Sequence, residues 1–267
     1  MTTILNGKIL DLKPFTDSIL FIGDSYTEAI SLHDNSKRFS KLVSDMLGLK
    51  QLNYGIGGTG FVSGHSTNTR YLNQLQNAYN DTAFNNDRVR YVIISGGRND
   101  AYGGPNYSLD TIYEYVHETV SYSIEHFVNA QTIVIPMFYD YKWIPDATYK
   151  WYLGIINGCL TLSCIILYDA FTMLTGYKDY ILSDNIHPNE YGHKLIADYI
   201  VRAIKSNDCN LVHTNNKYQI GNNIITLTEN TIECYINTTQ NYNTNDVIAQ
   251  ITVNSLHCEC YIPELIF

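Results

Sequence analysis

Residues 18–29 read SILFIGDSYTEA, an apolar run that turns polar within two residues. The run before Gly23 is short and continuously apolar, which is typical of a strand buried on both faces. Gly, Asp and Ser follow it, and these residue types also form ordinary turns. A serine at the carboxyl end of a buried strand, however, lies where open α/β sheets carry their chemistry. The stretch therefore predicts a strand that presents Ser25 at the rim of a sheet.

Four more apolar runs follow, and they alternate with stretches of helical periodicity. The expected strands are QLNYG (51–55), VRYVIISGG (89–97), TIVIPM (132–137) and CIILYD (164–169), and the expected helices cover 37–47, 109–128, 149–159 and 191–204. Strands separated by helices build a parallel sheet with helices on both faces. We therefore expect residues 18–205 to form a three-layer α/β/α sandwich around a five-stranded parallel sheet, with a flavodoxin-like arrangement.

The two ends of the chain have a different pattern. Residues 1–17 contain TTILNGKIL, a hairpin pattern with Asn6-Gly7 at its turn. Residues 206–267 hold short Thr- and Ile-rich runs broken by Asn and Gly, which predict a small antiparallel β module. A module of ~60 residues buries little apolar surface alone. We expect it to dock on the α/β body, with residues 2–10 as an extra strand, to bind glycans, or to assemble copies into a homo-oligomer.

Composition narrows the class of protein. The chain has 267 residues, 45% of them hydrophobic and 16% charged, which indicates a globular fold. Its formal net charge of −9 argues against a partner with a nucleic-acid phosphate backbone. No apolar run reaches the ~18–20 residues of a membrane span. The segment MTTILNGKILDLKPF lacks the pattern of a secretory signal, so we expect a cytoplasmic protein or one released by lysis or on a phage particle.

Two residue types are open to more than one interpretation. The 23 tyrosines often lie among asparagines, as in YLNQLQNAYN (71–80), which suits sugar contact but also fits simple compositional bias. Cys258 and Cys260, with His257 beside them, suggest a metal site, but six cysteines without a C-x-x-C pattern fit buried small hydrophobes better. We expect no metal and no cofactor.

The ends of the strands and one late loop together hold the parts of a serine hydrolase. His187 in SDNIHPNEYG (183–192) is a base for the Ser25 proton, and Asp184, three residues earlier, is suited to orient it. Acyl transfer also needs donors for the developing oxyanion. The Ser25 amide, the Gly58 amide in NYGIGGTG (53–60) and the Asn99 side chain in GGRND (96–100) are the candidates.

These four segments, in this order, resemble the four signature blocks of the SGNH hydrolases, also called GDSL esterases. The family's Ser, Gly, Asn and His fall on Ser25, Gly58, Asn99 and His187, and Asp184 occupies its D-x-x-H position. The resemblance covers roughly residues 18–205 and implies a serine hydrolase with a Ser-His-Asp triad. The first block departs from Gly-Asp-Ser-Leu, because Tyr rather than Leu follows the serine.

Four further residues are candidates for substrate contact. Tyr26 is placed to shape the acyl pocket, and Tyr102 lies in the polar loop after Asn99. Arg98 is suited to an anionic substrate group or to pairing with a carboxylate such as Asp100. His65 either lines the cleft or lies in a solvated loop. His193, in the last predicted helix, is expected at the surface.

The chain lacks a long apolar insertion that would form a lid, and its loops near the site are polar and rich in glycine. We therefore expect a serine esterase that removes small acyl groups, above all O-acetyl groups, from a carbohydrate, with an acylated small molecule or polysaccharide as substrate. A lysophospholipase or thioesterase of the same family is the alternative enzyme. A non-catalytic glycan-binding or phage-tail structural protein is the alternative of another class.

Overall fold

The computed structural model describes most of the predicted domain and the strands at both ends of the chain. The described residues are 2–5, 8–11, 17–64, 69–103, 107–138, 145–174, 178–205, 211–214, 217–220, 223–228, 231–235, 250–254 and 257–261. The chain divides into two compact units, Met1–Tyr235 and Ile236–Phe267.

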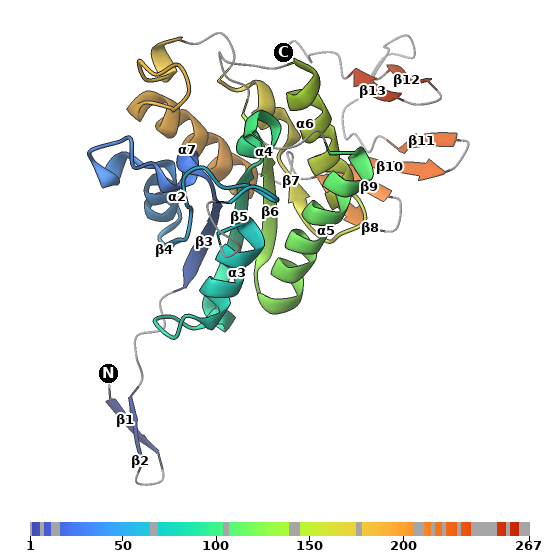
Figure 1. Cartoon of the computed structure of the whole chain (residues 1–267). Coiled ribbons are helices and arrows are strands. Elements are labelled where there is room, and N and C mark those ends of the chain that lie inside the picture. The colour runs from blue at the N-terminus through green and yellow to red at the C-terminus, as the bar shows by residue number, and fades with distance from the viewer. Residues whose placement is uncertain are drawn as a thin grey trace, which may run out of the picture. The chain divides into compact units, whose positions relative to one another are not determined.

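Five parallel strands form the centre of the first unit (Figure 1), which confirms the predicted sheet. In spatial order they are β4 (Lys50–Asn53), β3 (Ser18–Gly23), β5 (Val89–Gly96), β6 (Gln131–Pro136) and β7 (Ile165–Ile166). The chain leaves β3 for β4 on one side and returns to β5 on the other. Crevices at such a reversal are the usual ligand sites of open α/β sheets.

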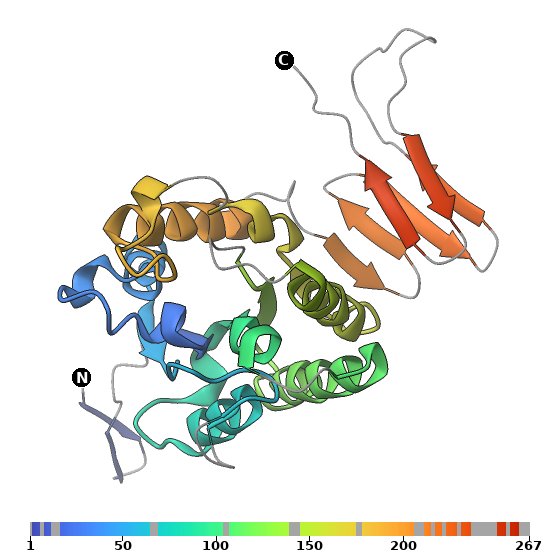
Figure 2. The ribbon, with the colours of Figure 1, turned by 45° about the horizontal axis from the view of Figure 1, so that its top comes forward.

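Helices cover both faces of this sheet in two layers, as Figures 1 and 2 show. Alternate residues of β3 enter different cores, because successive side chains of a strand point to opposite faces. Ile19 and Phe21 pack with one set of helices, and Leu20 and Ile22 pack with the other. The first set is α2 (Phe39–Leu47) and α7 (Glu190–Lys205), and the second is α3 (Tyr71–Asn80), α5 (Leu109–His126) and α6 (Pro145–Cys159).

Helix α3 is an element that the sequence pattern did not predict. Its tyrosine- and asparagine-rich sequence suggested an exposed, sugar-binding surface or compositional bias. In the structure Tyr71 is fully buried and Leu72, Leu75 and Ala78 face the core, at the spacing of one helix face. The exposed positions Asn77, Tyr79 and Asn80 carry much of the polar character, whereas Gln74 is polar and buried. The buried Tyr71 becomes important at the candidate site.

The other described elements are short. They are the short helices α1 (Ser25–Glu28) and α4 (Arg98–Gly103) and the 3₁₀ turns η1 (Asn35–Lys37), η2 (Asn86–Arg88), η3 (Tyr168–Thr172) and η4 (Lys178–Tyr180). β7 covers less than the predicted run 164–169, because the chain enters η3 at Tyr168. The free thiols of Cys159 and Cys164 are buried, as expected of small apolar side chains.

The remaining strands pair antiparallel with their neighbours in sequence. At the N-terminus β1 (Thr2–Leu5) pairs with β2 (Lys8–Asp11). After α7 come β8 (Leu211–Thr214), β9 (Lys217–Ile220), β10 (Asn223–Thr228) and β11 (Thr231–Tyr235), and the second unit contains β12 (Gln250–Asn254) and β13 (His257–Tyr261). That residues 206–267 act as one docking, glycan-binding or assembly module stays a prediction.

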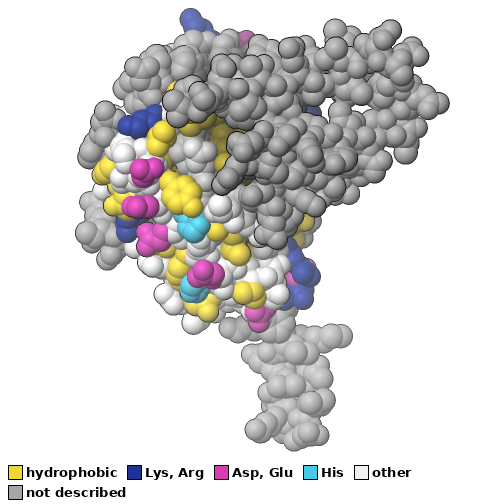
Figure 3. Space-filling view, turned by 90° about the vertical axis from the view of Figure 1, so that its right-hand side faces the viewer, with side chains coloured by type: hydrophobic (Ala, Val, Ile, Leu, Met, Phe, Trp, Pro, Cys, Tyr) yellow, Lys and Arg dark blue, Asp and Glu magenta, His cyan; other side chains and the backbone are white. Residues whose placement is uncertain are grey.

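On the face seen in Figure 3, hydrophobic, acidic and histidine side chains are interspersed, and the basic side chains lie toward its margins. This distribution agrees with the acidic net charge of −9. Within the described residues, no helix combines the length and the apolar character needed to cross a membrane.

Candidate active site

Ser25 is the first residue of α1, directly after β3. The preceding Asp24 caps this helix, since its Oδ1 accepts the Tyr26 N–H at 3.0 Å. The chain then leaves the helix through Ala29 in the left-handed conformation, at φ 50°. This single turn raises the Ser25 side chain above the carboxyl end of the sheet and leaves its amide in the first helical turn, where N–H groups lack helical partners.

His187 reaches Ser25 from a loop that lies 162 residues later in the chain. Its Nε2 is 3.0 Å from Ser25 Oγ, and its Nδ1 is 2.6 Å from Asp184 Oδ2. The other oxygen of Asp184 accepts the backbone N–H groups of Ile186 at 2.8 Å and His187 at 3.0 Å. Because Nδ1 donates to the carboxylate, Nε2 is left as the acceptor for the serine proton. The structure thus brings the three predicted residues into one hydrogen-bonded chain.

Asp184 remains ionised in this arrangement. Partial desolvation acts to raise the pKa of its carboxyl, but the hydrogen bonds from the His187 ring and from two backbone amides outweigh it and lower the pKa below its ordinary value. A carboxylate that stays charged favours the protonated imidazole that forms when His187 takes a proton.

The two predicted oxyanion donors beyond Ser25 follow β4 and β5, the two strands that flank β3. Gly58 lies after β4 with φ 73°, a left-handed conformation that suits glycine. Its N–H has no partner among the described residues. Asn99, after β5, donates one Nδ2–H to the Thr59 carbonyl at 2.8 Å, and its second N–H is unused within the described part of the chain. Thr59 adjoins Gly58, so this bond ties the two candidate donors together.

Two buried side chains of α3 support the site and were missed in the sequence. Gln74 Oε1 accepts the Gly23 N–H at 3.0 Å, and its Nε2 donates to the Gly23 carbonyl and to Thr59 Oγ1 at 3.1 and 2.9 Å. Tyr71 accepts the Gly97 N–H at 3.2 Å and donates to Asp24 Oδ2 at 3.2 Å. The turns after β3, β4 and β5 are therefore connected through α3.

Asp24 has a structural role. Its side chain is buried between the Tyr26 amide and the Tyr71 hydroxyl, and burial raises the pKa of its carboxyl to about 6. Because Ser25 Oγ is hydrogen-bonded to His187, we assign the role of base for the Ser25 proton to His187 and not to Asp24.

Tyr26 has internal partners on both its hydroxyl and its ring. It is only 4% exposed, and its hydroxyl donates to the carbonyl of Ile186, next to His187. Its ring stacks on Phe138 with centroids 5.8 Å apart and lies 5.9 Å from the His187 ring. We therefore interpret Tyr26 as a link between the nucleophile turn and the base loop. The link gives a reason for tyrosine rather than leucine after Ser25, and the placement of Tyr26 at the acyl pocket stays a prediction.

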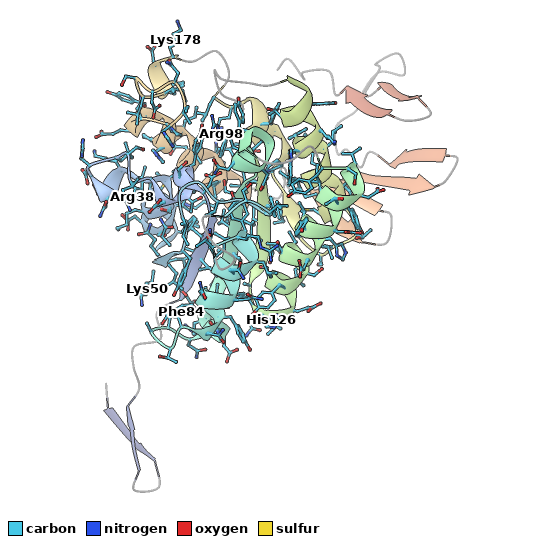
Figure 4. The ribbon with its side chains drawn as sticks, in the orientation of Figure 1. Arg38, Lys50, Phe84, Arg98, His126 and Lys178 are labelled. Atoms are coloured by element: carbon cyan, nitrogen blue, oxygen red, sulfur yellow. The ribbon has the colours of Figure 1, made fainter. Side chains whose placement is uncertain are left out.

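The other candidates for substrate contact are Arg98, Tyr102 and His65. Arg98 lies at the carboxyl edge of the sheet (Figure 4), and its guanidinium is 4.2 Å from the Tyr102 ring centroid. Asp100, offered as a partner for Arg98, instead accepts the N–H groups of residues 61–63 at 2.7–3.1 Å. His65 lies outside the described residues.

The prediction for His193 was wrong. The residue is fully buried, its Nδ1 accepts the Phe39 N–H at 3.2 Å, and its ring stacks on Phe39. Desolvation lowers the pKa of His193 to about 3, so the ring is neutral. Its spacing to Ile196, Ala197 and Ile200 is that of a buried helix face, which the sequence already contained.

Replacing Asn99 by alanine is expected to lower kcat for an ester substrate by about 10²–10³-fold with little change in KM, the usual loss for one oxyanion donor. The matched control is Asn86→Ala, because Asn86 Nδ2 also donates to a backbone carbonyl at 2.8 Å, in an exposed turn. An unchanged kcat in Asn99→Ala would show that Asn99 does not stabilise the oxyanion.

Comparison with protein families gives one match that covers most of the chain. The profile described as the GDSL-like lipase/acylhydrolase family matches residues 21–195, which include every residue of the Ser25–His187–Asp184 chain. Comparison with curated proteins gives no significant match.

Solved structures with the same fold cover about 70% of this chain at low sequence identity. A lipase/acylhydrolase from Enterococcus faecalis is 21% identical with a TM-score of 0.52, over 70% of this chain and 95% of its own. TesA is 15% identical with a TM-score of 0.54, over 70% and 98%. A carbohydrate esterase family 2 enzyme plus carbohydrate binding domain from Corynascus thermopiles (Myceliophthora fergusii) is 19% identical with a TM-score of 0.51, over 75% and 70%. These likenesses support the α/β fold.

Proposed function

The chain belongs to the GDSL-like lipase/acylhydrolase family, and on this basis we propose that it is a serine esterase that removes small acyl groups, above all acetyl groups, from a carbohydrate. The observation that carries the esterase assignment is the Ser25–His187–Asp184 chain, with its contacts of 3.0 and 2.6 Å. A strand-end serine that served only as a turn residue would not need a histidine and a carboxylate aligned behind it.

The proposed reaction proceeds through an acyl-enzyme. Ser25 Oγ attacks the ester carbonyl carbon while its proton moves to His187 Nε2, and the carbonyl oxygen becomes an oxyanion. The N–H groups of Ser25, Gly58 and Asn99 stabilise that charge. The tetrahedral intermediate then expels the alcohol, which takes the proton from His187. Water, activated by the same histidine, attacks the acyl-enzyme and releases the acid.

Close packing next to the Ser25 turn is compatible with a small acyl group. Asp24 and Tyr26, the chain neighbours of Ser25, line a cavity of about 10 Å³ with Arg98, Met137, Phe138 and the end of β5, whereas Ser25 itself does not line it. Tyr26, Met137 and Phe138 are buried, so the packing next to this turn leaves little room for a long acyl chain.

The carbohydrate part of the proposal rests on the polar, glycine-rich sequences near the site. The segments TGFVSGHSTNT (59–69) and AYGGPNYS (101–108) supply hydroxyl, amide and tyrosine groups, which suit a hydroxylated carrier. The Corynascus enzyme is an example of this fold in a carbohydrate esterase.

We expect kcat/KM for p-nitrophenyl acetate to exceed that for p-nitrophenyl octanoate, because the loop sequences near the site are polar and include no long apolar insertion that would hold an acyl chain. Parallel initial-rate measurements on the two esters test this. A higher kcat/KM for the octanoate would favour the lysophospholipase or thioesterase alternative. Release of acetate from a panel of O-acetylated polysaccharides then tests the carrier, and a protein that cleaves p-nitrophenyl acetate but no acetylated glycan contradicts the carbohydrate assignment.

A further inference from the structure

The side chain of Glu28 spans from the nucleophile turn to the glycine-rich segment after β4. Glu28 is the last residue of α1, three positions after Ser25 and therefore on the same side of the helical turn. Its Oε2 accepts the Gly57 N–H at 2.7 Å. One short helix thus carries the candidate nucleophile and a carboxylate that holds the neighbour of Gly58.

The segment that Glu28 holds lies directly against Ser25. A Cβ placed on Gly57 would be 2.8 Å from Glu28 Oε2 and 3.5 Å from Ser25 Cβ. On one side of the two glycines, the Ile56 N–H donates to the Gly23 carbonyl at 3.0 Å. On the other, Thr59 Oγ1 donates to the Ile56 carbonyl at 2.6 Å. Two adjacent glycines have a flexible backbone because neither carries a side chain. The hydrogen bond from the Gly57 N–H to Glu28 therefore limits how far the Gly58 amide can rotate.

We propose that Glu28 is a positioning residue for the oxyanion site: by holding the Gly57 N–H it aims the Gly58 N–H at the carbonyl oxygen of a substrate bound to Ser25. This inference rests on the proposed esterase function. The role requires the reach and the acceptor oxygen of Glu28 and does not require its charge. A negative charge near a developing oxyanion is unfavourable by Coulomb's law, so its presence there is explained by the hydrogen bond.

Two variants separate reach from charge. Glu28→Gln keeps the length and an acceptor oxygen but removes the charge, whereas Glu28→Asp keeps the charge and shortens the side chain by one methylene. We expect E28D to lower kcat for p-nitrophenyl acetate by about 10–100-fold at nearly constant KM, because a misplaced donor loses transition-state stabilisation. We expect E28Q to stay within about threefold of wild type, since its hydrogen bond is retained.

The matched control is Asp34→Ala. The Asp34 carboxylate also accepts a backbone N–H, that of Ser36 at 2.9 Å, but in the exposed turn η1. We expect kcat to be unchanged in this variant. All rates are expressed per active site titrated with a fluorophosphonate, so that loss of folded protein does not lower kcat.

A pH profile of kcat/KM completes the test, and we expect the same profile for E28Q as for wild type. The proposal is overturned if E28Q loses as much activity as E28D, if E28Q is the more damaged, or if both variants keep wild-type kcat. A wild-type protein that does not cleave the ester would instead overturn the proposed function, so the two failures are distinguishable.

Discussion

Replacing Ser25 by alanine is expected to lower kcat for p-nitrophenyl acetate by about 10⁶-fold, the loss seen when a serine hydrolase loses its nucleophile. The 3.0 Å contact from Ser25 Oγ to His187 Nε2 is the reason. Without the hydroxyl, His187 has no proton to accept and no acyl-enzyme forms. The remaining oxyanion donors still accelerate attack by water to some extent.

A second serine–histidine pair supplies the control for this experiment. Ser121 Oγ lies 3.4 Å from His117 Nδ1 on α5, away from the strand ends. The Ser121→Ala protein should keep wild-type kcat. If Ser25→Ala kept a tenth of the activity, another residue would be the nucleophile and the assignment of Ser25 would fail.

Replacing Asp184 by asparagine is expected to lower kcat by about 10³–10⁴-fold through the tautomer of His187. Asp184 Oδ1 accepts two backbone N–H groups, from Ile186 and His187, at 2.8 and 3.0 Å. An asparagine must keep its carbonyl oxygen on these donors, so its NH₂ group faces His187 Nδ1. Nδ1 then becomes an acceptor, the ring proton moves to Nε2, and Nε2 no longer accepts the proton of Ser25.

The measurement is kcat and KM for p-nitrophenyl acetate in Asp184→Asn and in a matched variant. Asp198→Asn is suitable, because Asp198 pairs with Lys194 at 2.6 Å on the exposed side of α7. We expect this control to be unchanged. Near-wild-type kcat in Asp184→Asn would show that Asp184 does not set the tautomer of His187.

The strands and the main site residues could be predicted because their signals are local. Each of the first three apolar runs ends in its own functional turn, and parallel strands bring those turns to one edge of the sheet. Ser25, Gly58 and Asn99 are placed in this way by the residues next to them. His187 lies in a late loop and was assigned from its spacing to Asp184 and from the resemblance of that segment to the family's D-x-x-H block.

The residues that hold the site could not be predicted because their contacts are long-range. Gln74 binds Gly23 from 51 positions away, and Tyr26 binds Ile186 across 160 positions. Such pairs leave no periodic trace in a single sequence. Tyr71 was hidden as well, since the polar composition of residues 71–80 masked the apolar face of α3.

Covalent labelling with an alkyl fluorophosphonate, followed by intact mass measurement and peptide mapping, tests the central claim most directly. We predict one phosphonyl group per chain, attached to Ser25, with loss of ester turnover in proportion to labelling. Addition of an acetylated substrate should slow the labelling. A protein that turns over the ester while Ser25 stays unlabelled, or that is inactivated by labelling at another residue, would contradict the account.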